Sequence, residues 1–162
     1  RLDLPFLRKC MGGVCRMAAQ RGYDLLLCYA DERDTAQLRR QLAARKVDGV
    51  ILSRTLVNDP CLELVRQYAA PCVGIGRLAD ETALQVDNDQ VGAARELTTR
   101  LLQMGLRRIA LLSGRLNYTV NVDRLAGFRQ ALAACGAAEE PGLIFTGVES
   151  EDGRVDALEA AL

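Results

Sequence analysis

The side chains best suited to chemistry in this sequence are polar groups placed at or after the ends of short apolar runs. They are Ser53, Asn88, Asp89, Asn117, Tyr118, Asn121 and Arg124. The chain of 162 residues contains no histidine, which excludes Ser-His-Asp and Cys-His catalysis and histidine-bound metals. Hydroxyl, amide, carboxylate and guanidinium groups suit hydrogen bonding to a small polar ligand. We therefore expect a binding protein, with no catalytic residue, no metal and no cofactor.

Strands and helices that alternate along the chain position these side chains. Apolar runs predict strands at 25–28, 50–53, 72–75, 84–86, 109–112 and 143–145. Apolar periodicity predicts helices at 6–21, after Asp34, after Pro60, after Asn88 or Asp89, after Asn121 or Asp123, and within 154–162. Such alternation is typical of an α/β fold with doubly wound parallel sheets covered by helices. Because ligands bind beyond the carboxyl ends of such strands, the functional loops are expected at 29–33, 53–58, 76–80, 87–90 and 113–121.

Local signals define several helix ends. Asp34 is expected to cap its helix, with Gln37 answering three residues later as in a capping box. Pro60 and Cys61 are expected to open the third helix, and Pro71 to follow its end. One of Asn88 and Asp89 is expected to serve as a helix cap, which leaves the other for a ligand.

Composition limits the partners and the compartment. Lys plus Arg and Asp plus Glu both number 21, so no general positive field attracts nucleic acid. Any contact with DNA is therefore expected outside this chain. The six cysteines form no C-x-x-C pair, and no signal peptide or long apolar run is visible. These features predict a cytoplasmic protein with reduced thiols.

Four segments, in order, resemble the LacI/GalR family of bacterial transcription regulators. The segments are Leu4-Pro5-Phe6-Leu7, Val47-Asp48-Gly49-Val50-Ile51-Leu52, Val86-Asp87-Asn88 with Gly92-Ala93, and Gly105 to Gly114 with Arg124-Leu125-Ala126-Gly127-Phe128. The sequence departs from the family pattern at Leu4, where the family has Asn, and at Leu106, where it has His. One extra residue also separates Asp87-Asn88 from Gly92.

This resemblance implies a periplasmic-binding-protein-like fold of type I, with two lobes and a ligand between them. Residues 1–104 would form the N-terminal lobe, and residues 105–162 would begin a C-terminal lobe that is incomplete here. The resemblance also implies a homodimer paired through the first lobe, with the helix at 6–21 as one surface. Operator DNA would be read by a headpiece that is absent from this chain, and the effector would be a sugar or related metabolite.

The resemblance also implies roles for single residues. Arg124 stands at the family's R-x-x-G-F position, where a guanidinium can meet ligand oxygens in pairs; the alternative is a solvated arginine. Ser53, Asn88 and Asp89 stand at loop positions that border the ligand, or serve as turn and cap residues. Phe6 and Leu7 align with the ligand-facing side of the first helix, although core packing remains an alternative. Asn117, Tyr118 and Asn121 are second choices.

Two other classes of protein stay open. A periplasmic solute-binding protein shares the fold, and an α/β enzyme would use a nucleotide. Gly74-Ile75-Gly76-Arg77-Leu78-Ala79 fits the dinucleotide pattern G-x-G-x-x-A. That pattern requires a helix starting at its glycines, whereas the next predicted element here is a strand. Nucleotide binding is therefore not favoured.

Overall fold

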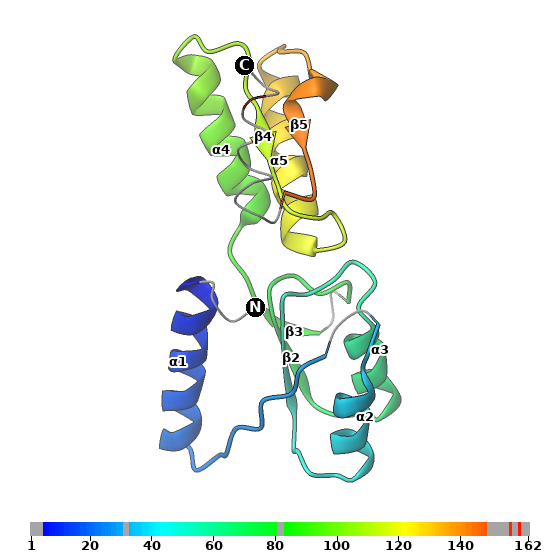
Figure 1. The fold of residues 1–162 in the computed structure, drawn as a ribbon. Coiled ribbons are helices and arrows are strands. Elements are labelled where there is room, and N and C mark those ends of the chain that lie inside the picture. The colour runs from blue at the N-terminus through cyan, green and yellow to red at the C-terminus, as the bar shows by residue number, and fades with distance from the viewer. Residues whose placement is uncertain (1–4, 31–32, 81–82, 149–155, 157–158, 160–162) are drawn as a thin grey trace. The chain divides into compact units, whose positions relative to one another are not determined.

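The computed structural model describes residues 5–30, 33–80 and 83–148, together with residues 156 and 159 (Figure 1). The helix expected within 154–162 lies almost entirely outside the described residues. The chain separates into two compact units, residues 1–47 and residues 48–162. The first unit holds two helices, and the second holds two parallel sheets with their helices.

The helices of the first unit begin and end close to where the sequence predicts. Helix α1 spans Pro5–Gln20 and α2 spans Ala36–Ala43. Leu38 and Leu42 are buried and form the inner face of α2. The predicted capping box is wrong. Asp34 does accept a hydrogen bond from the backbone N–H of Ala36 at 2.8 Å, but Gln37 instead accepts one from the backbone N–H of Tyr29 at 3.1 Å.

The buried strand predicted at 25–28 is not formed in this structure. Residues 23–30 form neither helix nor strand, and Leu25, Leu26 and Leu27 are 46%, 53% and 60% exposed. A strand needs a neighbour to exchange backbone hydrogen bonds. Among the described residues, no strand pairs with this segment. The apolar run is present in the sequence, but among the described residues no strand pairs with it and its leucines are not buried.

The first sheet of the second unit confirms three predicted strands. Strands β1 Val50–Ser53, β2 Cys72–Ile75 and β3 Leu84–Val86 are parallel and lie in the order β1-β2-β3. Helix α3, Pro60–Gln67, connects β1 to β2 and begins at Asp59, whose carboxylate accepts from the N–H of Cys61 at 2.9 Å. Leu52 is buried while Ile51 is 46% exposed. Strand β1 is therefore buried on one face only, because α3 packs on that side and the face with Ile51 meets solvent.

The second sheet is a short parallel pair with two long helices. Strands β4 Leu111–Leu112 and β5 Ile144–Phe145 pair in parallel, and a 3-10 turn, η1 Pro141–Leu143, precedes β5. Helix α4 spans Gln90–Gln103 and α5 spans Thr119–Ala134. Leu102, Leu125, Phe128 and Leu132 form the core, with Ile109, Leu111 and Ile144 packed around it. Helix α5 begins earlier than predicted, because buried Thr119 already lies in its first turn after Tyr118.

Helices α4 and α5 cross in close contact at Gly127, and Figure 1 shows them side by side. A Cβ atom built on Gly127 would lie 2.1 Å from the carbonyl oxygen of Val91 and 3.0 Å from the backbone nitrogen of Arg95. No side chain fits in that space, so glycine allows the two backbones to touch. This contact fixes the first turns of α4 against the middle of α5.

The glycines of the dinucleotide-like pattern have a structural explanation. Gly74 leaves room for the side chain of Leu78, which is 1% exposed. Gly76 adopts a φ of +107°, and a Cβ there would lie 2.9 Å from the hydroxyl of Thr55. The next element is β3, as predicted, rather than a helix. The pattern therefore serves a tight turn between two strands.

Candidate functional site

A hollow of about 350 Å³ lies where the chain leaves β2 and β3 and enters α4. Its lining comes from four segments: the β2–β3 loop, β3 with the loop after it, the start of α4 and the start of α5. The lining residues are Arg77, Gln85, Asp87, Asn88, Asp89, Gln90, Val91 and Asp123. All but Val91 are polar or charged. The hollow occupies the carboxyl ends of β2 and β3, where ligands of parallel sheets bind.

An ion pair between Arg77 and Asp123 forms one wall of the hollow. Nε of Arg77 donates to one carboxylate oxygen of Asp123 at 2.8 Å, and an Nη donates to the other at 2.7 Å. The Asp123 side chain is only 12% exposed, whereas the Arg77 side chain is 43% exposed. Paired donation of this kind is the strong geometry for a guanidinium and a carboxylate. It joins the β2–β3 loop to the first turns of α5.

The other polar groups of the hollow are held by local hydrogen bonds. Asp89 caps α4 by accepting from the N–H of Gly92 at 2.7 Å, and Asp87 accepts from the N–H of Asn88 at 2.8 Å. Gln85 accepts from the N–H of Leu78 at 2.7 Å. Each of these hydrogen bonds occupies one oxygen atom of the side chain, and an oxygen can accept a second one. The remaining oxygens and the amide N–H groups can bind hydroxyls of a ligand.

A second set of contacts joins the loop after β1 to the loop before α5. The hydroxyls of Thr55 and Thr119 lie 2.8 Å apart, and the N–H of Val57 donates to the carbonyl of Asn117 at 2.9 Å. The guanidinium of Arg54 stacks on the ring of Tyr118, 4.7 Å from its centre. Arg54 has a φ of +59°, a strained value for a residue other than glycine. One segment follows β1 and the other follows β4, so polar groups at the carboxyl ends of these two strands lie close together.

The predicted site residues of the second unit fall into three groups. Asn88 and Asp89 line the hollow, and Arg124 is exposed beside it, where its Nε donates to the amide oxygen of Gln90 at 3.0 Å. Asn117, Tyr118 and Asn121 belong to the second set of contacts, in which the amide of Asn121 donates to the carbonyl of Arg115 at 2.9 Å. Ser53 is exposed at the end of β1.

Phe6 and Leu7 belong to α1 in the first unit. Leu7 is 9% exposed and Phe6 is 58% exposed. The burial of Leu7 favours its packing alternative, while Phe6 presents a ring to solvent. Their ligand roles stay predictions, as do those of the other site residues.

Sequence reasoning missed several side chains that line the hollow. Arg77 and Asp87 lie within loops that were expected to be functional, but neither was singled out. Asp123 was considered only as a helix-starting residue. Its pairing with Arg77 spans 46 positions of sequence. The spacing of residues along the chain gives no sign of such a contact. The only available hint is that the two side chains carry opposite charges.

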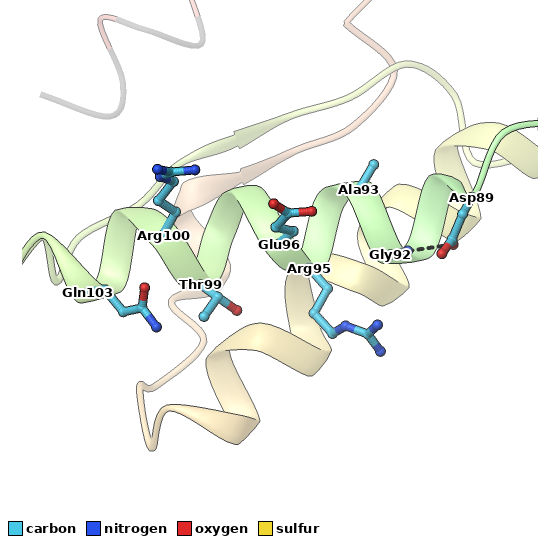
Figure 2. Close-up of a pocket in the computed structure, with 8 residues that line it drawn as sticks. All are labelled: Asp89, Gly92, Ala93, Arg95, Glu96, Thr99, Arg100 and Gln103. Atoms are coloured by element: carbon cyan, nitrogen blue, oxygen red, sulfur yellow. Dashed lines mark hydrogen bonds between the residues drawn. The ribbon is translucent and has the colours of Figure 1, made fainter.

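A larger hollow, of about 790 Å³, runs along one helix (Figure 2). Figure 2 shows that its lining consists of α4 and its cap, Asp89. Arg95, Glu96 and Arg100 are exposed there, and because a single helix with its cap supplies the whole lining, it is a surface groove with no opposing wall. Among the described residues, no group of three or more cysteine, aspartate or glutamate side chains is arranged to hold a metal ion. The smaller hollow, with walls from several segments, is the better candidate.

Three further features of the described residues bear on the class of protein. All six cysteines are free thiols. Within the part of the chain that the structure describes, helices are too short or too polar to cross a membrane. The parallel sheets with crossover helices confirm the predicted α/β class.

Comparison with known proteins identifies the family. The model for periplasmic binding proteins and the sugar-binding domain of the LacI family matches residues 1–162. The HTH-type transcriptional regulator CelR of Thermobifida fusca is 32% identical over 98% of this chain and 48% of its own length. The ribose operon repressor of Escherichia coli K12 is also 32% identical, over 98% of this chain and 49% of its own. The chain thus spans about half the length of the curated relatives it matches.

Solved structures agree with the sequence comparison. A transcriptional regulator CelR–cellobiose complex matches with a TM-score of 0.86 at 31% identity, covering 98% of this chain and 50% of that one. A LacI-type regulator from Bacillus cereus subsp. cytotoxis matches with a TM-score of 0.89 at 26% identity, covering 98% and 58%. The fold is therefore periplasmic-binding-protein-like, and the chain belongs to the family of periplasmic binding proteins and LacI-type sugar-binding domains.

Proposed function

We propose that this chain is part of the ligand-sensing domain of a bacterial transcription regulator, and that the hollow at Arg77, Asp87, Asn88 and Asp123 binds a sugar. The observation that carries the proposal is the lining of that hollow, where carboxylates and amides from separate segments meet at the carboxyl ends of β2 and β3. Such groups accept from and donate to the hydroxyls of a sugar. The relatives named as regulators, one of them in complex with cellobiose, support the same conclusion.

Regulation would follow from a shift between two lobe arrangements. A ligand that binds one arrangement better favours it in proportion to the difference in affinity. In a homodimer this shift would change how an attached headpiece sits on operator DNA. We propose that the complete protein carries the headpiece, forms the homodimer, and acts on its operator in the cytoplasm. We propose no catalytic activity.

The division between the two lobes is also a proposal. The sequence predicts lobes at 1–104 and 105–162, which separates α4 from α5. The backbone contact at Gly127 supports keeping those two helices together instead. We therefore propose that the lobes divide just ahead of Gln90, so that the hollow lies where the chain passes from one to the other.

A thermal-shift screen on the complete protein tests the ligand proposal. Cellobiose, maltose and ribose are the first probes, because the relatives are named for cellobiose, maltose or ribose systems. A binding sugar raises the midpoint of unfolding as its concentration rises. Asn88→Ala and Arg124→Ala should reduce that shift, because the first lines the hollow and the second holds Gln90 at its rim.

The control variant is Arg100→Ala, which changes an exposed guanidinium further along α4, outside the hollow. It should leave the sugar shift unchanged. A shift that survives both Asn88→Ala and Arg124→Ala would place the sugar elsewhere and refute the site. Sugar binding without any effect on operator binding would favour the alternative of a periplasmic solute-binding protein.

A further inference from the structure

The hollow contains an excess of negative charge. Asp87, Asp89 and Asp123 supply three carboxylates, and Arg77 supplies the one guanidinium among the lining residues. The uncharged polar groups there are the side-chain amides of Gln85, Asn88 and Gln90. A carboxylate accepts hydrogen bonds but donates none. The lining is therefore matched to a ligand that brings hydrogen-bond donors.

Asp123 neutralises the guanidinium that would otherwise attract an anion. Both of its oxygens accept from Arg77, at 2.8 and 2.7 Å. The carboxylate is 12% exposed, so water screens this pair less than an open surface pair. An anionic ligand would have to compete with Asp123 for Arg77 and would also face Asp87 and Asp89. Like charges brought together at a binding site repel each other, which weakens the binding of an anion.

Arg124 does not reverse this balance. It lies outside the lining of the hollow and is exposed, and its Nε is engaged by the amide oxygen of Gln90. Its remaining N–H groups suit the hydroxyls of a ligand at the rim. Even with this second guanidinium counted, three carboxylates face two cations.

We propose that the Arg77–Asp123 ion pair makes the hollow selective for an uncharged polyhydroxyl ligand and excludes phosphorylated or carboxylated ones. This inference rests on the proposed function of the hollow and specifies the class of sugar. Asp123 acts as a specificity-determining residue, since it occupies the guanidinium that a phosphate would bind in pairs.

Titration of the complete protein with inorganic phosphate, followed by calorimetry, tests the ion pair without any sugar. The wild-type protein should show no saturable binding. Asp123→Asn removes the negative charge that pairs with Arg77, so this variant should gain phosphate binding that weakens with added salt. Asp123→Asn combined with Arg77→Gln should lose it again. Saturable phosphate binding by the wild-type hollow, or no gain in Asp123→Asn, would overturn the proposal.

The matched control is Glu139→Gln, which releases Arg129 from an equally close paired contact on an exposed surface. A free guanidinium there, without a hollow around it, should bring no saturable phosphate binding. If Glu139→Gln gains as much as Asp123→Asn, the effect belongs to any released arginine and the proposal fails.

A second measurement needs no variant and remains decisive if Asp123→Asn does not fold. The affinity of the wild-type protein is measured for cellobiose and for ribose, and each value is compared with the affinity for the phosphate monoester of the same sugar. We expect the uncharged member of a binding pair to be preferred by at least about tenfold. A preference for the phosphate ester overturns the selectivity while leaving sugar sensing intact. If no sugar binds, the proposed function fails, and the phosphate titration still decides whether the ion pair excludes anions.

Discussion

The hydroxyls of Thr55 and Thr119 lie 2.8 Å apart, although 64 residues separate them in the chain. The two side chains are 3% and 1% exposed. Thr119 also donates its backbone N–H to the carbonyl oxygen of Thr55 at 3.2 Å. The loop after β1 is thus attached to the first turn of α5 by a polar contact that water does not reach.

Replacing either threonine by valine should destabilise the protein. The effect should be larger for Thr119→Val, because the hydroxyl of Thr55 then loses its hydroxyl partner, whereas in Thr55→Val the hydroxyl of Thr119 keeps the carbonyl oxygen of residue 55 at 3.3 Å. We expect Thr55→Val or Thr119→Val to lower the free energy of unfolding by about 1–3 kcal/mol. The double variant should lose clearly less than the sum, since removing both hydroxyls leaves neither unsatisfied. Denaturant unfolding of all four proteins measures this coupling. Strictly additive losses would show that the two hydroxyls do not interact.

The crossing of α4 and α5 predicts a large effect from one methyl group. Gly127→Ala places a Cβ atom against the backbone of Val91 and Arg95, which cannot move without separating the helices. We expect a loss of about 1–3 kcal/mol in the free energy of unfolding. Gly13→Ala on α1 is the control, because a Cβ there meets nothing within 4 Å. It should stabilise the protein by up to about 1 kcal/mol through helix propensity. Equal effects of the two changes would contradict the close crossing.

The pair Arg129–Glu139 predicts a pH dependence. Hydrogen bonds from Arg129 hold the pKa of Glu139 below its ordinary value in the folded protein. A carboxyl group with a lowered pKa stabilises the fold when it is ionised, and this contribution is lost as pH falls through the folded pKa. The stability difference between wild type and Glu139→Gln should therefore be constant near neutral pH, begin to shrink as the pH falls past roughly 4, and vanish only below the lowered pKa of Glu139 in the folded protein. A difference that persists in acid would show that charge is not its cause.

The six thiols should differ in reactivity. Burial, with a smaller contribution from the charge of Asp59, raises the pKa of the Cys72 thiol. Less thiolate is then present at a given pH, and the thiolate is the reactive form. Alkylation at mildly alkaline pH, followed by mass spectrometry, should modify exposed Cys135 well before Cys72. Cys72→Ser should remove the slow label at position 72 and leave the rate at Cys135 unchanged. Equal rates at both sites would refute the prediction.

The sequence was sufficient for elements whose signal is local. Asp59 and Pro60 mark the start of α3, and the apolar runs of β1 and β2 fit their parallel pairing. The prediction of a strand at 25–28 was wrong because a strand forms only beside a neighbouring strand, and an apolar run carries no information about that neighbour. Helix α5 starts earlier than Asn121, since Thr119 is fixed by a contact with Thr55 rather than by a capping side chain.

The candidate site was predicted only in outline. The expected loops at 76–80 and 87–90 do meet at the hollow, because the carboxyl ends of parallel strands share an edge. The partner of Arg77 could not be predicted. Asp123 lies on α5, which connects the two strands of the second sheet, whereas Arg77 follows a strand of the first sheet. Only folding brings these two charges together.

The glycine at the crossing of α4 and α5 has a consequence for protein engineering. Gln90 on α4, and Asp123 and Arg124 on α5, stand on two backbones that touch directly. A designer who wants a biosensor for a different metabolite can therefore exchange these side chains on a stiff frame, without having to repack a layer of residues between the helices. In a library for such a purpose, Gly127 is the position to hold constant.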